Sequence, residues 1–156
     1  PADDTRKYTI ENLQYLSEKA KEKNISLLLE HLTVETTNLA IKADELAELC
    51  AEAGCDNLIG MADTDMMSRY GESVSDYMKA FSGKIGHIHF VDGLPGGHLA
   101  PGDGRLPMDR FLEELSVAEY NGYISLEITN DRYHLEPDKA IEKSLKWLEE
   151  RIKRTV

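Results

Sequence analysis

Cysteine is scarce in this 156-residue sequence, which argues against a small secreted protein held together by disulfides. The two cysteines are Cys50 and Cys55, and neither has a partner at C-x-x-C spacing. Cys50 lies on the apolar side of an expected helix, and Cys55 follows the end of that helix. We therefore expect two buried, reduced thiols, no structural zinc site and a cytoplasmic location.

Basic residues and long apolar runs are also in short supply. Lys and Arg number 18 against 29 Asp and Glu, which gives a net charge of -11. This balance opposes nucleic-acid binding, because phosphate recognition needs clustered cations. No apolar run has the length of a membrane span, and no signal peptide is recognisable. The chain does not begin with Met, so processing or truncation is one explanation of its start.

The apolar periodicity predicts alternating helices and strands in a single domain, residues 1–156. Apolar runs predict strands at residues 25–32, 57–64, 84–92 and 122–129. Ser73 and Asp76 form a plausible capping pair for one helix. The expected helical stripes are Ile10, Leu13, Leu16 and Ala20; Ala43, Leu46, Ala47 and Cys50; Val74, Tyr77, Met78 and Phe81; Met108, Phe111, Leu112 and Leu115, after Pro107; and Ile141, Leu145, Leu148 and Ile152, after Pro137. The order αβαβαβαβα indicates an α/β fold of parallel βα units with right-handed crossovers.

Each predicted strand carries a potential metal ligand toward its C-terminal end. These residues are Glu30, Asp63, His89 and Glu127. Successive members are about one βα unit apart, a unit of roughly 30 residues or more. Parallel α/β proteins build their sites at that end of the sheet, so we expect the four side chains to meet there.

Three carboxylates and one imidazole suit a single divalent cation such as Mn²⁺, Co²⁺ or Mg²⁺. Taken singly, a strand-end carboxylate is more often solvated or a helix N-cap. A buried pair such as Glu30 and Glu127 would be costly without a partner, and a metal would remove that cost. His87 points to the same face as His89, one layer deeper. It is either a hydrogen-bonded core residue or a support for the site.

Several segments together resemble a known family. They are "LLLEHL", "MADT", "HIHFVDGLPGGHLAPGDGRLPMDRFLEEL" and "EYNGYISLEIT". The sequence resembles the sugar phosphate isomerase/epimerase family with a xylose-isomerase-like TIM barrel, most nearly the ketose 3-epimerases and fructoselysine 3-epimerases. The resemblance covers nearly the whole chain but corresponds to the C-terminal half of the barrel only, strands five to eight. An N-terminal half-barrel would then be missing.

The resemblance implies one divalent metal ion bound by Glu30, Asp63, His89 and Glu127. It also implies that Glu30 and Glu127 act as the acid/base pair. One removes a proton from the carbon beside the substrate carbonyl and the other returns it on the opposite face, through an enediolate.

The resemblance further implies substrate contacts from His98, Glu35 and the position of Met66. His98 stands where the family often has a cation, and Glu35 matches an acidic residue only approximately. Met66 replaces a common histidine, which removes a polar contact and leaves room for a modified sugar. The loop after His89, with tight turns at Gly96–Gly97 and Gly102–Gly104, is expected to fold over the site and present His98.

The function expected is that of a metal-dependent sugar isomerase or 3-epimerase acting on a ketose or ketose derivative. The alternative is a non-catalytic C-terminal fragment, folded but inactive without its N-terminal half. An endonuclease-IV-like enzyme shares the barrel but would need more histidines than five and a basic surface. The uncovered inner face and unpaired strand edges of a half-barrel predict a partner, either a second copy or the missing N-terminal half.

Overall fold

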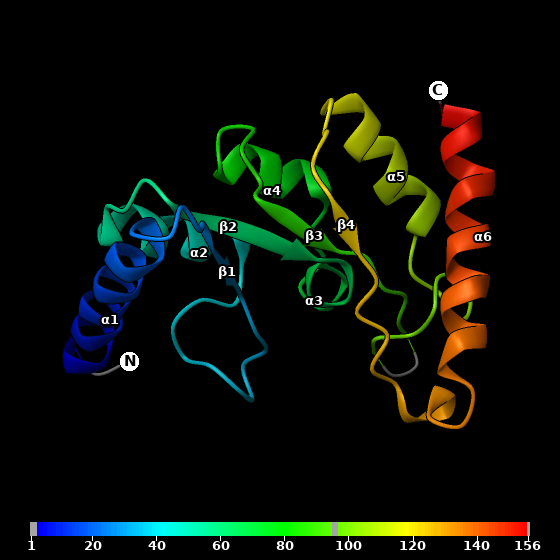
Figure 1. The fold of residues 1–156 in the computed structure, drawn as a ribbon, viewed down its shortest axis with the longest axis horizontal. Helices are drawn as coiled ribbons and strands as arrows, with labels where there is room; N and C mark the ends of the chain where they lie inside the picture. Colours follow the sequence, from blue (N-terminus) through cyan, green and yellow to red (C-terminus); the bar gives the residue numbers. More distant parts are fainter. Residues whose placement is uncertain (1–2, 95–96, 156) are drawn as a thin grey trace.

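The computed structural model describes residues 3–94 and 97–155 of this chain as helices packed around a parallel sheet (Figure 1). The elements are α1 (Asp3–Lys21), β1 (Leu27–Glu30), α2 (Ala43–Ala53), β2 (Leu58–Asp63), α3 (Thr64–Arg69), α4 (Val74–Ala80), β3 (His87–His89), α5 (Met108–Val117), β4 (Ile124–Ser125), the short 3-10 helix η1 (Asp131–Tyr133) and α6 (Pro137–Thr155). None of the described helices is both long enough and apolar enough to span a membrane.

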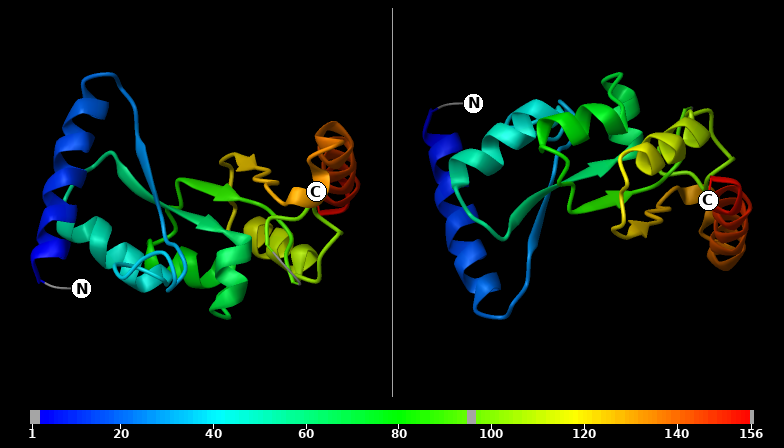
Figure 2. Two further views of the ribbon diagram at one scale, coloured as in Figure 1. Left: turned by 90° about the horizontal axis from the view of Figure 1, so that it is seen from below. Right: turned by 90° about the horizontal axis from the view of Figure 1, so that it is seen from above.

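The four strands lie in the order β1-β2-β3-β4, and every neighbouring pair is parallel. Strand order equal to chain order is the arrangement of successive βα units in a barrel wall. Helices α2, α4 and α5 lie on one side of the sheet, while α1 and α6 stand at its opposite ends (Figure 2). The predicted α/β class and half-barrel architecture are confirmed.

The core fills the space between the sheet and the helices on its outer side. Ala62 and Ile88 from the strands are fully buried, as are Val74 and Tyr77 from α4. Helix α4 begins with the predicted capping box, in which Ser73 and Asp76 bond each other's backbone N–H groups. These contacts fix the outer helices on the sheet and so hold the strand ends in place.

Two details differ from the sequence prediction, and a third prediction lies partly outside the described residues. Helix α3 follows β2 without a loop, because Asp63 serves as its N-cap. The predicted strand 122–129 pairs only at Ile124–Ser125, since β4 lies at the edge with a single neighbour. The turn at Gly96–Gly97 falls partly outside the described residues, because the structure describes Gly97 but not Gly96.

Two predicted apolar stripes are less buried than expected. Leu16 on α1 is 52% exposed, and Ile141, Leu145 and Ile152 on α6 are between 45% and 50% exposed. On the inner face of β1, Leu28 is 42% exposed. These residues lie at the two ends of the sheet and on its open face, where a half-barrel has no neighbouring strand or helix to cover them.

Candidate active site

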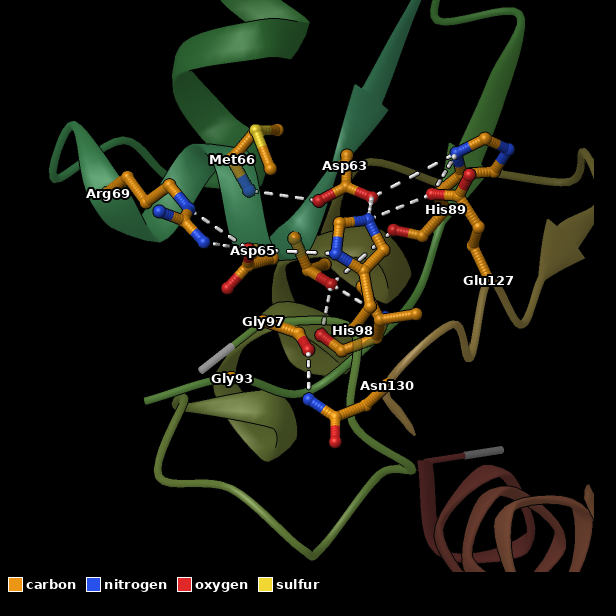
Figure 3. A network of polar contacts seen from close by, with 12 residues as sticks. Asp63, Asp65, Met66, Arg69, His89, Gly93, Gly97, His98, Glu127 and Asn130 are labelled. Atoms are coloured by element: carbon orange, nitrogen blue, oxygen red, sulfur yellow. Dashed lines mark hydrogen bonds and ion pairs between the residues drawn. The ribbon is translucent and has the colours of Figure 1, made fainter. Parts of the chain in front are cut away.

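The four predicted ligands converge at the C-terminal ends of the strands. Glu30, Asp63, His89 and Glu127 each offer one atom, and these atoms all lie within 4.8 Å of one another. His89 Nδ1 is 3.1 Å from Glu30 Oε1, 3.2 Å from Glu127 Oε2 and 3.9 Å from Asp63 Oδ2. Figure 3 shows three of these side chains around a common centre. The structure therefore brings together the whole set that strand-end spacing predicted.

The ligands are staggered along the sheet rather than level in register. Glu30 pairs with Met61, two residues before Asp63, while Asp63 pairs with His89. His89 in turn pairs with Ser125, two residues before Glu127. Strands of a barrel tilt against its axis, so such a stagger brings side chains of successive strands to one height. The tilt of the sheet thus assembles the site.

Asp63 is both a helix cap and a member of the cluster. Its Oδ1 accepts a hydrogen bond from the Met66 backbone N–H at 2.9 Å, which fixes the carboxylate at the start of α3. Its Oδ2 is buried and has no hydrogen-bond partner among the described residues. A buried, unpartnered carboxylate oxygen is unfavourable unless something cationic binds it.

The same burial affects the protonation of the cluster. Burial raises the pKa of Glu30, and the negative charges of Asp63 and Glu127 raise it further, while His89 opposes the rise. Burial also raises the pKa of Asp63, against the opposing effect of the Met66 N–H. Without a metal ion, the surroundings of the cluster therefore do not fully stabilise its carboxylates in their ionised form.

The donor set and its geometry fit a divalent cation. Three carboxylates and an imidazole are ligands of Mn²⁺, Co²⁺ and Mg²⁺, and no cysteine lies among them. Asp63 Oδ2, which has no hydrogen-bond partner among the described residues, faces the His89 and His98 rings (Figure 3). His87 stands deeper, where its Nε2 is 2.7 Å from Ser125 Oγ and its ring meets that of His89 edge-on. It packs against His89 and is itself hydrogen-bonded, which agrees with both interpretations offered for it.

The glycine-rich loop after β3 is held by one buried carboxylate. Asp92 is 1% exposed and accepts hydrogen bonds from the backbone N–H groups of Gly93, Gly102, Gly104 and Leu106, at 2.8 to 3.0 Å. Its backbone also pairs with that of Leu99 in an isolated bridge. The strand-closing acid thus ties the loop back on itself.

The predicted substrate residues lie at different distances from this centre. His98 reaches it, with Nε2 3.0 Å from Glu127 Oε2 and 3.8 Å from Asp63 Oδ2. Glu35 is fully exposed on the loop after β1 and lies outside the four-residue cluster. The Met66 side chain is 7% exposed, and the contact of this residue with the site is its backbone N–H.

Three polar residues around the site were not identified from the sequence. Thr64 Oγ1 donates to the Val91 carbonyl and accepts from its N–H, which links the start of α3 to the end of β3. Asp65, 2% exposed, lies beneath the loop, and Asn130, the N-cap of η1, donates to the Gly97 carbonyl of the loop. The signals available were the second acid of "DTD" and a polar residue after "LEIT".

Comparison with known proteins agrees with this architecture. A fructoselysine 3-epimerase from Escherichia coli O157:H7 is 30% identical over 120 residues, 76% of this chain and 44% of that protein. A hydroxypyruvate isomerase from Escherichia coli (strain K12) is 27% identical over 143 residues, 90% of this chain and 52% of that protein. The chain therefore spans about half the length of the curated relatives it matches.

Among solved structures, a D-allulose 3-epimerase from Methylomonas sp. superposes with a TM-score of 0.84 at 19% identity, over 96% of this chain and 57% of that one. At that identity the likeness shows the fold. The family described as xylose isomerase-like TIM barrel matches residues 1–151. By sequence and by fold, this chain belongs to the xylose isomerase-like TIM barrel family.

Proposed function

We propose that this chain carries the metal and proton-transfer centre of a sugar isomerase or 3-epimerase that acts on a ketose or ketose derivative. The observation that carries the proposal is the convergence of Glu30, Asp63, His89 and Glu127 within 4.8 Å at the strand ends. The relatives named as a fructoselysine 3-epimerase and a hydroxypyruvate isomerase support the same reaction class.

Glu30 and Glu127 are placed to move the proton. They come from β1 and from just beyond β4, the two outer strands of the four, so they approach a bound sugar from opposite sides. Epimerisation needs this arrangement, since one group removes the proton beside the carbonyl and the other delivers it to the other face.

The remaining ligands orient this pair. Asp63 is fixed by its cap to the Met66 N–H, and His89 stands between Glu30 and Glu127 with its Nδ1 toward both. A divalent cation held by the four residues would polarise the substrate carbonyl and stabilise the developing enediolate charge. His98, beside Glu127, is placed to contact a sugar hydroxyl or carbonyl oxygen.

Two measurements test the proposal. Calorimetric titration with Mn²⁺ should show one site, and that site should be lost in Asp63→Ala and His89→Ala. Incorporation of solvent deuterium beside the carbonyl of a ketose reports proton transfer, and Glu127→Gln should slow it by about 10²–10⁴-fold. Glu142→Gln, an exposed change on α6, is the matched control and should alter neither result. Exchange at the parental rate in Glu127→Gln would remove Glu127 from the mechanism.

A second candidate function is that of a metal-binding half without activity of its own. It is favoured by the open inner face of the sheet, where Leu28 is 42% exposed, because a sugar there has protein on one side only. This candidate predicts Mn²⁺ binding without deuterium exchange, and exchange that appears when an N-terminal half-barrel is supplied. Exchange by this chain alone would exclude it.

A further inference from the structure

Asp65 is a buried acid outside the four-residue cluster. It lies on α3, two residues beyond Asp63, and is 2% exposed. A carboxylate at that depth needs charged or hydrogen-bonding partners. The partners that the structure gives it lie on α3 and on the loop after β3, so the residue connects two segments far apart in sequence.

The carboxylate of Asp65 has Arg69 on one side and the His98 ring on the other (Figure 3). Arg69, one turn along α3, donates to Oδ2 from Nε at 3.0 Å and lies 2.9 Å away through Nη2. On the other side, His98 Nδ1 stands 3.9 Å from the same oxygen. Asp65 therefore faces one edge of the His98 ring, while Glu127 faces the other edge at Nε2.

The loop backbone closes directly on this carboxylate. A Cβ atom at Gly93 would overlap Asp65 Oδ1, and one at Gly97 would overlap Oδ2. The loop is held from the opposite side by Asn130, whose Nδ2 donates to the Gly97 carbonyl at 3.1 Å and whose backbone N–H donates to the His98 carbonyl at 3.3 Å. With Asp65 on one side and Asn130 on the other, the His98 segment is clamped.

His98 itself adopts a backbone conformation that needs such support. Its φ of 58° lies in the left-handed region, which is unfavourable for a residue with a Cβ. The conformation aims the ring across the mouth of the site, with Nε2 toward Glu127 and Asp63. A loop histidine without a clamp would sample other rotamers and lose this aim.

We propose that Asp65 is a positioning residue, which fixes the His98 ring through its Nδ1 edge so that Nε2 is presented to the sugar beside Glu127. This inference rests on the proposed function for its consequence, the contact with substrate, but its geometry stands without turnover. It also accounts for Gly93 and Gly97 among the glycines of the loop, since any side chain at either position would separate the loop from the carboxylate.

The competing explanation is that Asp65 only pairs with Arg69 and staples α3. Two variants separate these roles. Asp65→Asn keeps the shape beneath the loop and removes the charge that faces His98. Arg69→Met removes the other partner and leaves Asp65 in place. A role through Arg69 predicts equal effects of the two changes, and a role through His98 predicts an effect of Asp65→Asn alone.

The measurement is ¹⁵N NMR of the histidine rings in the metal-free and Mg²⁺-saturated protein. The chain has five histidines, and His98→Gln assigns the signals of interest by their loss. We expect Asp65→Asn to shift the His98 ring nitrogens and change their tautomer ratio, while Arg69→Met leaves them near the parental positions. Unchanged His98 signals in Asp65→Asn, or equal shifts in both variants, would overturn the proposal.

Two further measurements distinguish this role from support of the proposed metal ligands and cover the case in which the variant does not fold. Mg²⁺ affinity by calorimetry should stay within about twofold of the parent in Asp65→Asn, because the ligand set is intact; a lost site would mean that Asp65 supports the metal ligands instead. If Asp65→Asn does not fold, a crystal structure of the Mg²⁺-bound parent decides, with Nδ1 and Oδ2 expected to approach hydrogen-bond distance, about 3 Å. A His98 ring turned away from Asp65 there would refute the inference. Where the parent turns over a ketose, Asp65→Asn should raise KM about tenfold with a smaller change in kcat.

Discussion

Asparagine at position 63 should separate folding stability from metal binding. In Asp63→Asn the side-chain oxygen can still accept the Met66 N–H that starts α3, so the helix cap is kept. The amide nitrogen replaces Oδ2, the buried oxygen without a hydrogen-bond partner, and it can donate toward Glu30 or Glu127. The change removes one metal ligand and one buried negative charge at the same time.

The expected gain in folding stability of the metal-free protein follows from the repulsion between its neighbouring carboxylates. Two carboxylates whose oxygens lie within 4.8 Å of each other repel by about 3–4 kcal/mol at an effective dielectric of 20, and His89 and His98 offset part of this. An unpaired buried polar group costs about 1–3 kcal/mol. We expect Asp63→Asn to stabilise the metal-free fold by about 1–2 kcal/mol, which raises Tm by about 2–4 °C per kcal/mol for a chain of this size.

The pH dependence has a defined sign. Burial raises the pKa of Asp63 in the folded chain above its value in the unfolded chain. Ionised Asp63 therefore destabilises the fold. The contribution of protonated Asp63 to folding stability is fully present at low pH and is lost as pH rises through the folded pKa. The advantage of Asp63→Asn over the parent should be largest at neutral pH and should shrink on acidification.

The assay is thermal unfolding in EDTA and in saturating Mn²⁺. In EDTA the variant should melt above the parent; in Mn²⁺ the order should reverse, because a ligand at 100 times its Kd stabilises by about 2.7 kcal/mol. Asp92→Asn is the control, since that carboxylate accepts four backbone N–H groups and its variant should be less stable in both conditions. An Asp63→Asn protein that melts below the parent in EDTA would refute the reasoning.

Three further predictions concern the loop, a helix cap and assembly. His98→Ala should weaken sugar binding about tenfold in calorimetry and leave Mn²⁺ affinity unchanged; the reverse pattern would make His98 a ligand. Ser73→Ala removes half of the capping box of α4 and should cost about 1 kcal/mol in urea unfolding, whereas Ser75→Ala, exposed in the same helix, should cost little. Light scattering at micromolar concentration should give a mass above the monomer, because Leu28 and the edges of β1 and β4 are uncovered; a stable monomer would contradict this.

The sequence predicted that Glu30, Asp63, His89 and Glu127 would meet because each lies at or just beyond the end of its own strand, and the spacing of βα units is a local property. It did not locate Asp65 or Asn130, because their roles depend on a loop that closes from residues about 30 positions away. It also overestimated the burial of Leu16 and Ile152, since an apolar stripe reveals that a helix has a face and not whether a neighbour covers that face. The sequence also predicted a longer fourth strand than the structure has, because it does not reveal that β4 lies at the edge of the sheet and pairs with β3 alone.

Three buried aspartates near this site differ in how many hydrogen-bond and charged partners their carboxylates have. Asp92 is 1% exposed and accepts four backbone hydrogen bonds, so the loop itself stabilises its negative charge. Asp65, equally deep, has Arg69 on one side and leaves its other side to His98. Asp63 has one backbone donor, and its Oδ2 has no hydrogen-bond partner among the described residues, with the His89 and His98 rings 3.9 Å and 3.8 Å away. Since burial costs all three a similar desolvation, the unmet part of that cost is what a bound group can supply, and it increases from Asp92 through Asp65 to Asp63. Among the Asp→Asn variants at these three positions, Asp63→Asn should therefore lose the largest part of the stabilisation that Mn²⁺ gives.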